Sequence, residues 1–230
     1  MNIIWLGHGS FRIEIEDQVL LIDPWLHGNP MLEEAQHGTA IDGATQILVT
    51  HGHFDHTDDI AEVARRCGAP VAGMFELMAW LEGKGVENAT GFNKGGTIHC
   101  GKVAVTMVPA SHSSSVTGDA VPVYTGAETG FMIRGEGRTV YFSGDTTIMA
   151  DMEWMGDYHK PDIGILSAGG FYTMDMKAAA YAAKRYFDFT TVIPCHYRTF
   201  DALAQNADDL IAGLPDVEVI EPQVMQPIEL

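Results

Sequence analysis

The run His51-Gly52-His53-Phe54-Asp55-His56 places four potential metal-binding side chains within six residues. It directly follows Ile47-Leu48-Val49-Thr50, an apolar run that is typical of a buried strand. In an extended segment His51 and His53 project to the same side, because side chains alternate along a strand. Once the chain turns, Asp55 and His56 can face a second point nearby. Imidazole and carboxylate suit zinc and similar ions, so the run indicates a metal site rather than a histidine-rich surface loop.

Three more candidate ligands lie downstream, each just after a strand-like run. They are His112 after Val103–Val108, Asp145 after Tyr141–Gly144, and His196 after Val192–Cys195. Layered folds assemble their sites at strand ends. Each residue alone would be interpreted as a cap or a core residue, but together with the His51 run they indicate one site.

Hydrophobic periodicity predicts strands and helices along the whole chain. Strands are expected at residues 11–16, 19–22, 47–50, 103–108, 130–134, 139–142, 163–166, 191–194 and 217–220. Helices are expected at residues 60–66, with Thr57 as the N-cap, and at 75–81, 175–187 and 202–210. Two stacked sheets with helices outside would fit this pattern, and so would a doubly wound sheet.

Composition and charge indicate the number of domains, the partners and the cellular location to be expected. The 230 residues contain no repeat or linker, so a single domain spanning residues 1–230 is expected. With 13 basic and 31 acidic residues the net charge is −18, which disfavours nucleic acid as a partner. Three scattered cysteines, Cys67, Cys100 and Cys195, do not suggest a disulfide framework. No signal peptide or long apolar span is evident, so a cytoplasmic protein without a membrane partner is expected.

The order of these motifs resembles the metallo-β-lactamase superfamily. That order is His-x-His-x-Asp-His, a lone His, Gly-Asp-Thr and a late His, here from Asp23 to His196. More narrowly the chain resembles the UPF0173 metal-dependent hydrolases, which are similar to the ascorbate-6-phosphate lactonase type. The supporting runs are Gly7–Phe11, Asp23–Trp25, Thr50–His53, His112–Ser115, Tyr141–Thr146 and Ile193–Tyr197.

The resemblance implies a fold, a ligand set and a reaction. The fold would be a four-layer αββα sandwich. One metal ion would take His51, His53 and His112; the other would take Asp55, His56 and His196, with Asp145 bridging. Two divalent ions, zinc first with manganese, nickel or iron as alternatives, would lower the pKa of a shared water toward ~7 and supply hydroxide. Asp55 and Asp145 are the expected catalytic carboxylates, and Cys195 is expected in the core.

The expected activity is hydrolysis of an ester, lactone or related bond in a small molecule, with an anionic substrate as one hypothesis. Three rival hypotheses are a small-molecule phosphodiesterase, a di-iron redox protein and a non-enzymatic metal-binding protein. Di-iron relatives usually carry Glu at the position of His53, which favours hydrolysis here. A homo-oligomer is compatible with the sequence, which does not decide the oligomeric state.

Several residues near the motifs are candidates for positioning or for substrate binding. Asp23 would hold a ligand histidine, or else act as a turn aspartate. His8 would border the metals, or else bond backbone. Tyr197 and Arg198 follow His196, and the Arg198 guanidinium would hold an anion, or else pair with Asp201. Residues 113–125 are expected to form a mobile loop over the site, with apolar walls from Trp25, Phe54, Phe171 and Tyr172.

Overall fold

Two β-sheets of equal strand number form the centre of the molecule. A computed structural model describes residues 1–118 and 120–230, and within these residues each large sheet has seven strands. The first sheet has the order β16 (Pro227–Glu229), β1 (Asn2–Gly7), β2 (Ser10–Ile15), β3 (Gln18–Ile22), β4 (Gln46–Val49), β5 (Val71–Met74) and β6 (Ala89–Phe92). The second has the order β15 (Glu218–Val219), β14 (Thr191–Cys195), β13 (Ile163–Ser167), β12 (Arg138–Phe142), β11 (Thr129–Gly135), β8 (Val103–Pro109) and β7 (Thr97–Cys100).

The two sheets pack face to face around the apolar core. The Phe11 ring of β2 lies 5.7 Å from the Phe142 ring of β12, edge to face. Farther along, the rings of Phe92 in β6 and Phe131 in β11 are stacked at 6.4 Å. Burying a side chain of this size contributes about 1.5–3 kcal/mol, so these contacts hold the two sheets together as one layered unit.

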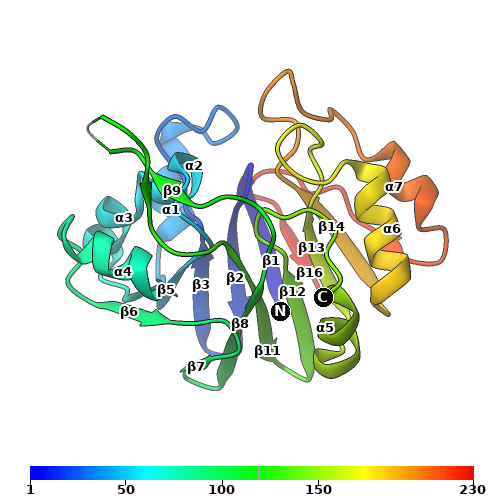
Figure 1. Cartoon of the computed structure of the whole chain (residues 1–230), viewed down its shortest axis with the longest axis horizontal. Coiled ribbons are helices and arrows are strands. Elements are labelled where there is room, and N and C mark those ends of the chain that lie inside the picture. The colour runs from blue at the N-terminus through cyan, green and yellow to red at the C-terminus, as the bar shows by residue number, and fades with distance from the viewer. Residues whose placement is uncertain (119) are drawn as a thin grey trace.

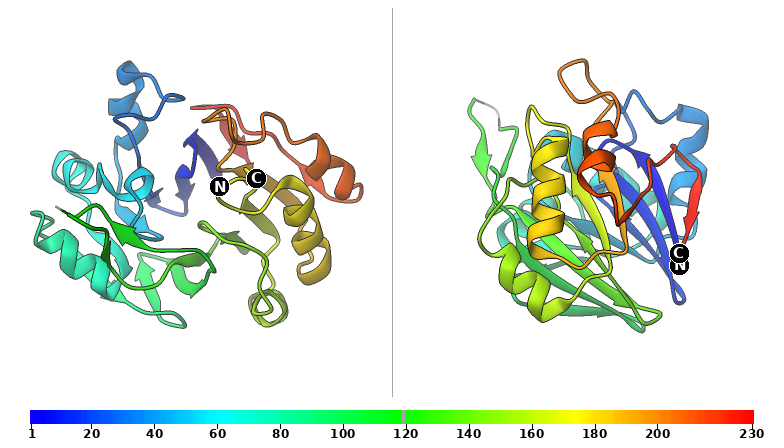
Figure 2. Two further views of the ribbon diagram at one scale, coloured as in Figure 1. Left: turned by 45° about the horizontal axis from the view of Figure 1, so that its top comes forward. Right: turned by 90° about the vertical axis from the view of Figure 1, so that its right-hand side faces the viewer.

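Helices cover the two outer faces, as the ribbon views show (Figure 1, Figure 2). The helices beside the first sheet are α1 (His37–Ile41), α2 (Phe54–Thr57), α3 (Ile60–Cys67) and α4 (Phe75–Glu82). Those beside the second sheet are α5 (Met152–His159), α6 (Met176–Tyr186) and α7 (Asp208–Gly213). This arrangement confirms the expected αββα sandwich and excludes a single doubly wound sheet. None of the described helices has the length and apolar character needed to cross a membrane.

The predicted N-cap of the helix at residues 60–66 was wrong. Thr57 ends the short helix α2, where its hydroxyl donates to the His53 carbonyl at 2.8 Å. The N-cap of α3 is Asp59, whose carboxylate instead accepts hydrogen bonds from the backbone N–H groups of Leu26 and His27. A tertiary contact with the 24–29 loop therefore replaces the local cap.

The helix expected at residues 202–210 was also wrong, since α7 begins only at Asp208. Backbone groups of the preceding residues bond across to other loops. The Ala204 N–H donates to Gly169 O at 2.9 Å, and the Arg198 N–H donates to Ala204 O at 2.8 Å. Helix α5 was not expected at all. Its Gly156 lowers helix propensity but is required there, since a Cβ would collide with Tyr186 O.

Candidate metal centre

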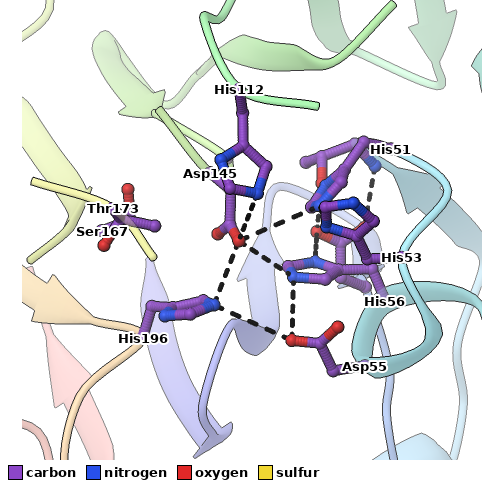
Figure 3. A network of polar contacts seen from close by, with 12 residues as sticks. His51, His53, Asp55, His56, His112, Asp145, Ser167, Thr173 and His196 are labelled. Carbon is purple, nitrogen blue, oxygen red and sulfur yellow. Dashed lines mark hydrogen bonds and ion pairs between the residues drawn. The ribbon is translucent and has the colours of Figure 1, made fainter. Parts of the chain in front are cut away.

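The structure brings all seven predicted ligands to one rim of the sandwich (Figure 3). They stand after β4 (His51, His53), on α2 (Asp55, His56), after β8 (His112), after β12 (Asp145) and after β14 (His196). Strands β12, β13 and β14 are parallel, so their carboxyl ends meet at the same edge. Residues far apart in the sequence therefore converge because the strands that carry them end side by side.

One carboxylate oxygen lies at the centre of the cluster. Asp145 Oδ2 is within 4 Å of the Nε2 atoms of four histidines, as the dashed lines in Figure 3 trace. The distances are 3.0 Å to His196, 3.5 Å to His56, 3.7 Å to His112 and 3.9 Å to His51. The side chain of Asp145 is almost fully buried. Its oxygen is thus in contact with both halves of the cluster.

One half of the cluster consists of His51, His53 and His112. Their donor atoms all lie within 4.8 Å of one another. His51 Nε2 and His53 Nδ1 face each other at 3.0 Å. The outer nitrogens are engaged elsewhere, since His51 Nδ1 lies 3.0 Å from Thr50 Oγ1 and His53 Nε2 lies 3.2 Å from Ser113 Oγ. These contacts orient the inner nitrogens toward a common point.

The other half contains Asp55, His56 and His196, together with His8. Asp55 Oδ2 lies 3.6 Å from His56 Nε2 and 3.8 Å from His196 Nε2. The same oxygen is 2.8 Å from His8 Nε2, and Thr199 Oγ1 lies 2.8 Å from His8 Nδ1. His8 is fully buried, with its ring 3.9 Å from the ring of His196. Of the two hypotheses for His8, the structure supports the one that places it at the cluster.

Asp23 lies behind the cluster and holds one of its histidines. Its Oδ2 is 2.7 Å from His56 Nδ1, and both of its oxygens accept hydrogen bonds from Thr50, one from the backbone N–H and one from the hydroxyl. The opposite nitrogen, His56 Nε2, is buried and has no hydrogen-bond partner among the described residues. A carboxylate on one imidazole nitrogen and an open second nitrogen is the usual arrangement around a metal-binding histidine.

Burial and charge divide the histidines into two groups. Burial lowers the pKa values of His51, His53 and His112, so these imidazoles are neutral and can donate a lone pair. Burial also opposes charge on His56 and His196. There the carboxylates prevail, chiefly Asp145, and they raise the pKa of His196 to about 9 and that of His56 well above its ordinary value. When no cation is bound, protons on His56 and His196 therefore balance the negative charges of the carboxylates.

Three residues of the cluster region adopt a left-handed backbone without being glycine. The φ angles are +53° for His8, +46° for Asp23 and +56° for His196. Such a conformation costs of the order of 1–3 kcal/mol for a non-glycine residue, and it persists where function requires it. The His196 N–H also donates to His8 O at 2.9 Å, which ties the two turns together. We infer that the strained backbone at these three residues is retained because it directs their side chains toward the cluster.

The donor set fits a divalent metal ion. Neutral imidazoles and ionised carboxylates are the ligands that zinc and related ions take. A cation would give the open His56 Nε2 a partner and would replace the protons that now balance Asp55 and Asp145.

Comparison with known proteins agrees with this chemistry. The family model described as the beta-lactamase superfamily domain matches residues 18–197. A UPF0173 metal-dependent hydrolase of Roseobacter denitrificans is 65% identical over 99% of both chains, and one of Cereibacter sphaeroides is 61% identical over 100% of both. The chain belongs to the beta-lactamase superfamily, among the UPF0173 metal-dependent hydrolases.

Solved structures show the same fold. Igni18, a metallo hydrolase from the archaeon Ignicoccus hospitalis, is 29% identical and aligns over 100% of this chain and 98% of its own, with a TM-score of 0.85. A possible metal-dependent hydrolase from Veillonella parvula is 21% identical, covers 100% of this chain and 99% of its own, and has a TM-score of 0.80. At that lower identity the likeness concerns the fold alone.

A cavity of about 530 Å³ opens onto the cluster of this hydrolase. Its lining residues are His53, Phe54, Asp55, His112, Ser113, Asp145, Tyr172, His196 and Phe200. Phe54 and Tyr172 were expected as walls, whereas Phe200 was missed. Trp25 lies behind Phe54 and Phe200, and Phe171 packs edge-on against Tyr172. No sequence signal marks Phe200, because its position depends on the turn that follows His196.

Arg198 and Tyr197 are not among the residues that line this cavity. The Arg198 guanidinium lies 5.8 Å from the ring centres of Trp5 and Tyr197, and Tyr197 is buried with its ring stacked on Trp5. The Tyr197 hydroxyl points to Glu221 at 3.4 Å. The expected pairing of Arg198 with Asp201 does not occur among the described residues either. The structure therefore gives no support to Arg198 as an anion-binding group.

The segment after His112 forms a small hairpin beside the cavity. Strands β9 (Ser115–Val116) and β10 (Val123–Tyr124) pair antiparallel, and the hydroxyl of Ser114 accepts a hydrogen bond from the Gly52 N–H at 3.1 Å. Asp119, part of the loop expected over the site, lies outside the described residues. The hairpin is thus attached to the histidine run itself.

Proposed function

We propose that the chain hydrolyses an ester, lactone or related carbonyl bond of a small molecule at a dinuclear metal site. The observation that carries this proposal is the position of Asp145 Oδ2 beside the Nε2 atoms of four histidines. One ion would be held by His51, His53 and His112, and the other by Asp55, His56 and His196. Asp145 would bind both. Zinc is the first choice, and manganese, nickel and iron suit the same ligands.

Such ions would polarise the carbonyl and lower the pKa of a bound water, so that hydroxide is available near neutral pH. The chain's own residues position the reaction. Asp55 and Asp145 both reach the cavity, so we assign to them the polar contacts with the attacking water. His8 holds Asp55 and Asp23 holds His56, which keeps both ligands oriented before substrate arrives.

The side chains near the cluster support water as the nucleophile. Cys195 is buried, and burial together with the charge of Asp145 raises the pKa of its thiol well above the usual value, so a thiolate is disfavoured. Ser113, the serine in the cavity lining, has its hydroxyl against His53 Nε2, a nitrogen on the ring of a proposed ligand. Neither residue has a free base beside it that would activate it.

We also propose that the substrate is a small molecule and that the enzyme works in the cytoplasm. The net charge of −18 disfavours a polymeric phosphate, and the cavity is of a size for a small ligand. A small phosphodiester remains the competing substrate class, because two adjacent metal ions can bind its oxygens without help from a lysine or arginine.

Metal analysis of the purified protein, followed by an activity screen, tests the proposal. We expect about two ions per chain, loss of both by chelation, and turnover of lactones, esters or thioesters that returns when the metal is restored. Phosphodiesters belong in the same screen as the competing class. A chain that holds at most one ion, or that is equally active after chelation, contradicts the dinuclear mechanism.

A further inference from the structure

The cavity beside the proposed metal site is lined by both aromatic and ionisable side chains. Phe54, Tyr172 and Phe200 are its aromatic lining residues, and they share the lining with the metal-binding candidates. Phe54 and Tyr172 are each about half exposed, at 50% and 54%. Phe54 packs at a right angle on the buried Trp25, which fixes its ring at the mouth of the cavity. A substrate bound at the cluster would therefore contact these rings.

Exposed apolar side chains gather around this cavity. Among the described residues, six of the eleven exposed large apolar side chains lie on the three segments that surround it. They are Phe54 on α2, Val121, Val123 and Tyr124 on the hairpin, and Phe171 and Tyr172 after β13. Of these six, Phe54 and Tyr172 line the cavity and Val121 lines a neighbouring hollow, which favours a binding surface because exposed apolar residues are normally scattered singly.

A second hollow continues the cavity beneath the hairpin. It measures about 260 Å³ and shares His53 and Phe54 with the first. Its remaining lining residues among those that the structure describes are uncharged, namely Ser115, Val116, Thr117, Gly118, Ala120, Val121 and Pro122. The two hollows therefore adjoin at Phe54, so a substrate bound at the cluster can extend along its ring into the second hollow.

Away from the proposed metal ions, an anionic group on the substrate would meet no lysine or arginine among the described residues that line this path. Arg198, the cation nearest in sequence to a proposed ligand, lies over Trp5 and Tyr197 instead. An anion moved from water into such surroundings loses hydration and gains no compensating bond.

We propose that the substrate carries an uncharged apolar group, alkyl or aromatic, that sits between Phe54, Tyr172 and Phe200 and extends beneath the β9–β10 hairpin. The hydrolysed bond would then lie at the Asp145 end of the cavity. This assignment rests on the proposed function for the chemistry, but it concerns the chain's own aromatic residues. It replaces the expectation of an anionic substrate.

Binding of hydroxamates to the metal-loaded protein tests the assignment without any need for turnover. Acetohydroxamate, octanohydroxamate and the monohydroxamate of succinate present the same chelating group with a short, an apolar and an anionic tail. Titration calorimetry should give octanohydroxamate at least about 30-fold higher affinity than acetohydroxamate, since each buried methylene adds up to about fourfold. The succinate compound should bind no better than acetohydroxamate.

Single substitutions in the cavity lining then test where the apolar tail of the hydroxamate binds. Tyr172→Ala and Phe200→Ala should each weaken octanohydroxamate about 5- to 20-fold while leaving acetohydroxamate and the bound metal unchanged. Tyr172→Phe keeps the ring and should bind as the wild type. Tyr181→Ala is the matched control, because Tyr181 is equally exposed, at 56%, but lies on α6 outside both hollows.

The outcomes separate this inference from the function on which it rests. Equal affinity for the short and apolar tails, or preference for the anionic one, overturns the apolar assignment and leaves the metal site intact. A loss with Tyr181→Ala as large as that with Tyr172→Ala also overturns it. Absence of bound metal and of acetohydroxamate binding would instead contradict the proposed function itself.

Discussion

Asp23 Oδ2 lies 2.7 Å from His56 Nδ1, with both groups buried beneath the histidine cluster. Asp23 follows β3 and His56 belongs to α2, and strands β3 and β4 are parallel neighbours that bring the two together. The contact determines which nitrogen of His56 faces the cluster. It also explains why a buried carboxylate, whose pKa burial raises, is kept in the core at all.

Replacement of Asp23 should weaken metal binding without abolishing the fold. In Asp23→Asn the carboxylate that orients His56 is lost, so metal affinity should fall about 10–100-fold, as is typical for partners of metal-binding histidines. Competition with a chelator of known affinity measures this. Asp216→Asn, at an exposed position near the C-terminal end, is the control. Unchanged affinity in Asp23→Asn would mean that the contact is only structural.

Replacement of Asp145 should affect both halves of the cluster at once. Asp145→Asn keeps the shape of the side chain but removes the charge shared by four histidines, so we expect bound metal to fall from about two ions toward one and turnover to fall at least about 1,000-fold. Elemental analysis and kinetics on the same sample measure the two effects. Two tightly bound ions with normal turnover would refute the bridging role.

Gly169→Ala should displace His196 although position 169 is not a ligand. A Cβ at this position would collide with the His196 carbonyl oxygen, so the strained turn that aims His196 must move. We expect loss of at least one ion and of nearly all activity. Gly38→Ala is the matched control, since a Cβ there meets nothing within 4 Å. Metal content close to that of the wild type in Gly169→Ala would show that the turn can adapt.

Metal binding should release protons at neutral pH. In the metal-free protein the carboxylates, chiefly Asp145, raise the pKa values of His56 and His196, the latter to about 9, so both are protonated at pH 7. A cation must displace these protons, and ionisation of a bound water would add another, so we expect at least about two released per chain. Affinity should rise as pH increases toward 9. Calorimetry in buffers of different ionisation enthalpy measures the number, and no release at pH 7 would contradict the assignment of these two ligands.

Arg198→Ala should leave the kinetics unchanged. Its guanidinium lies over Trp5 and Tyr197 rather than in the cavity. KM and kcat should therefore equal those of the wild type, while the free energy of unfolding falls by about 0.5–1 kcal/mol through loss of the cation–π contacts. Denaturant unfolding and steady-state kinetics test this together. A large rise in KM would restore Arg198 as a substrate-binding residue.

The positions of the proposed ligands were accessible from sequence because each follows an apolar strand. Strand ends are marked locally by hydrophobic periodicity, and parallel strands in one sheet end at a common edge. The alternation of residues 11–16 and the alanine-rich helix at residues 175–187 were visible for the same reason. Thr57 misled because its hydroxyl bonds back to the His53 carbonyl at the N-cap of α2, and residues 202–210 misled because Ala204 bonds with the distant Gly169.

The sequence by itself determined the kind of chemistry, since four imidazole and carboxylate side chains within six residues are typical of a metal site and rare elsewhere. Only the tertiary structure decided how that chemistry is supported. Left-handed turns at His8, His196 and Arg198 set three features of the site. These are the contact of His8 with Asp55, the position of Phe200 in the cavity lining and the position of Arg198 outside that lining. Such turns cost local energy that is offset by packing of the whole sandwich, so no local pattern in the sequence reports them.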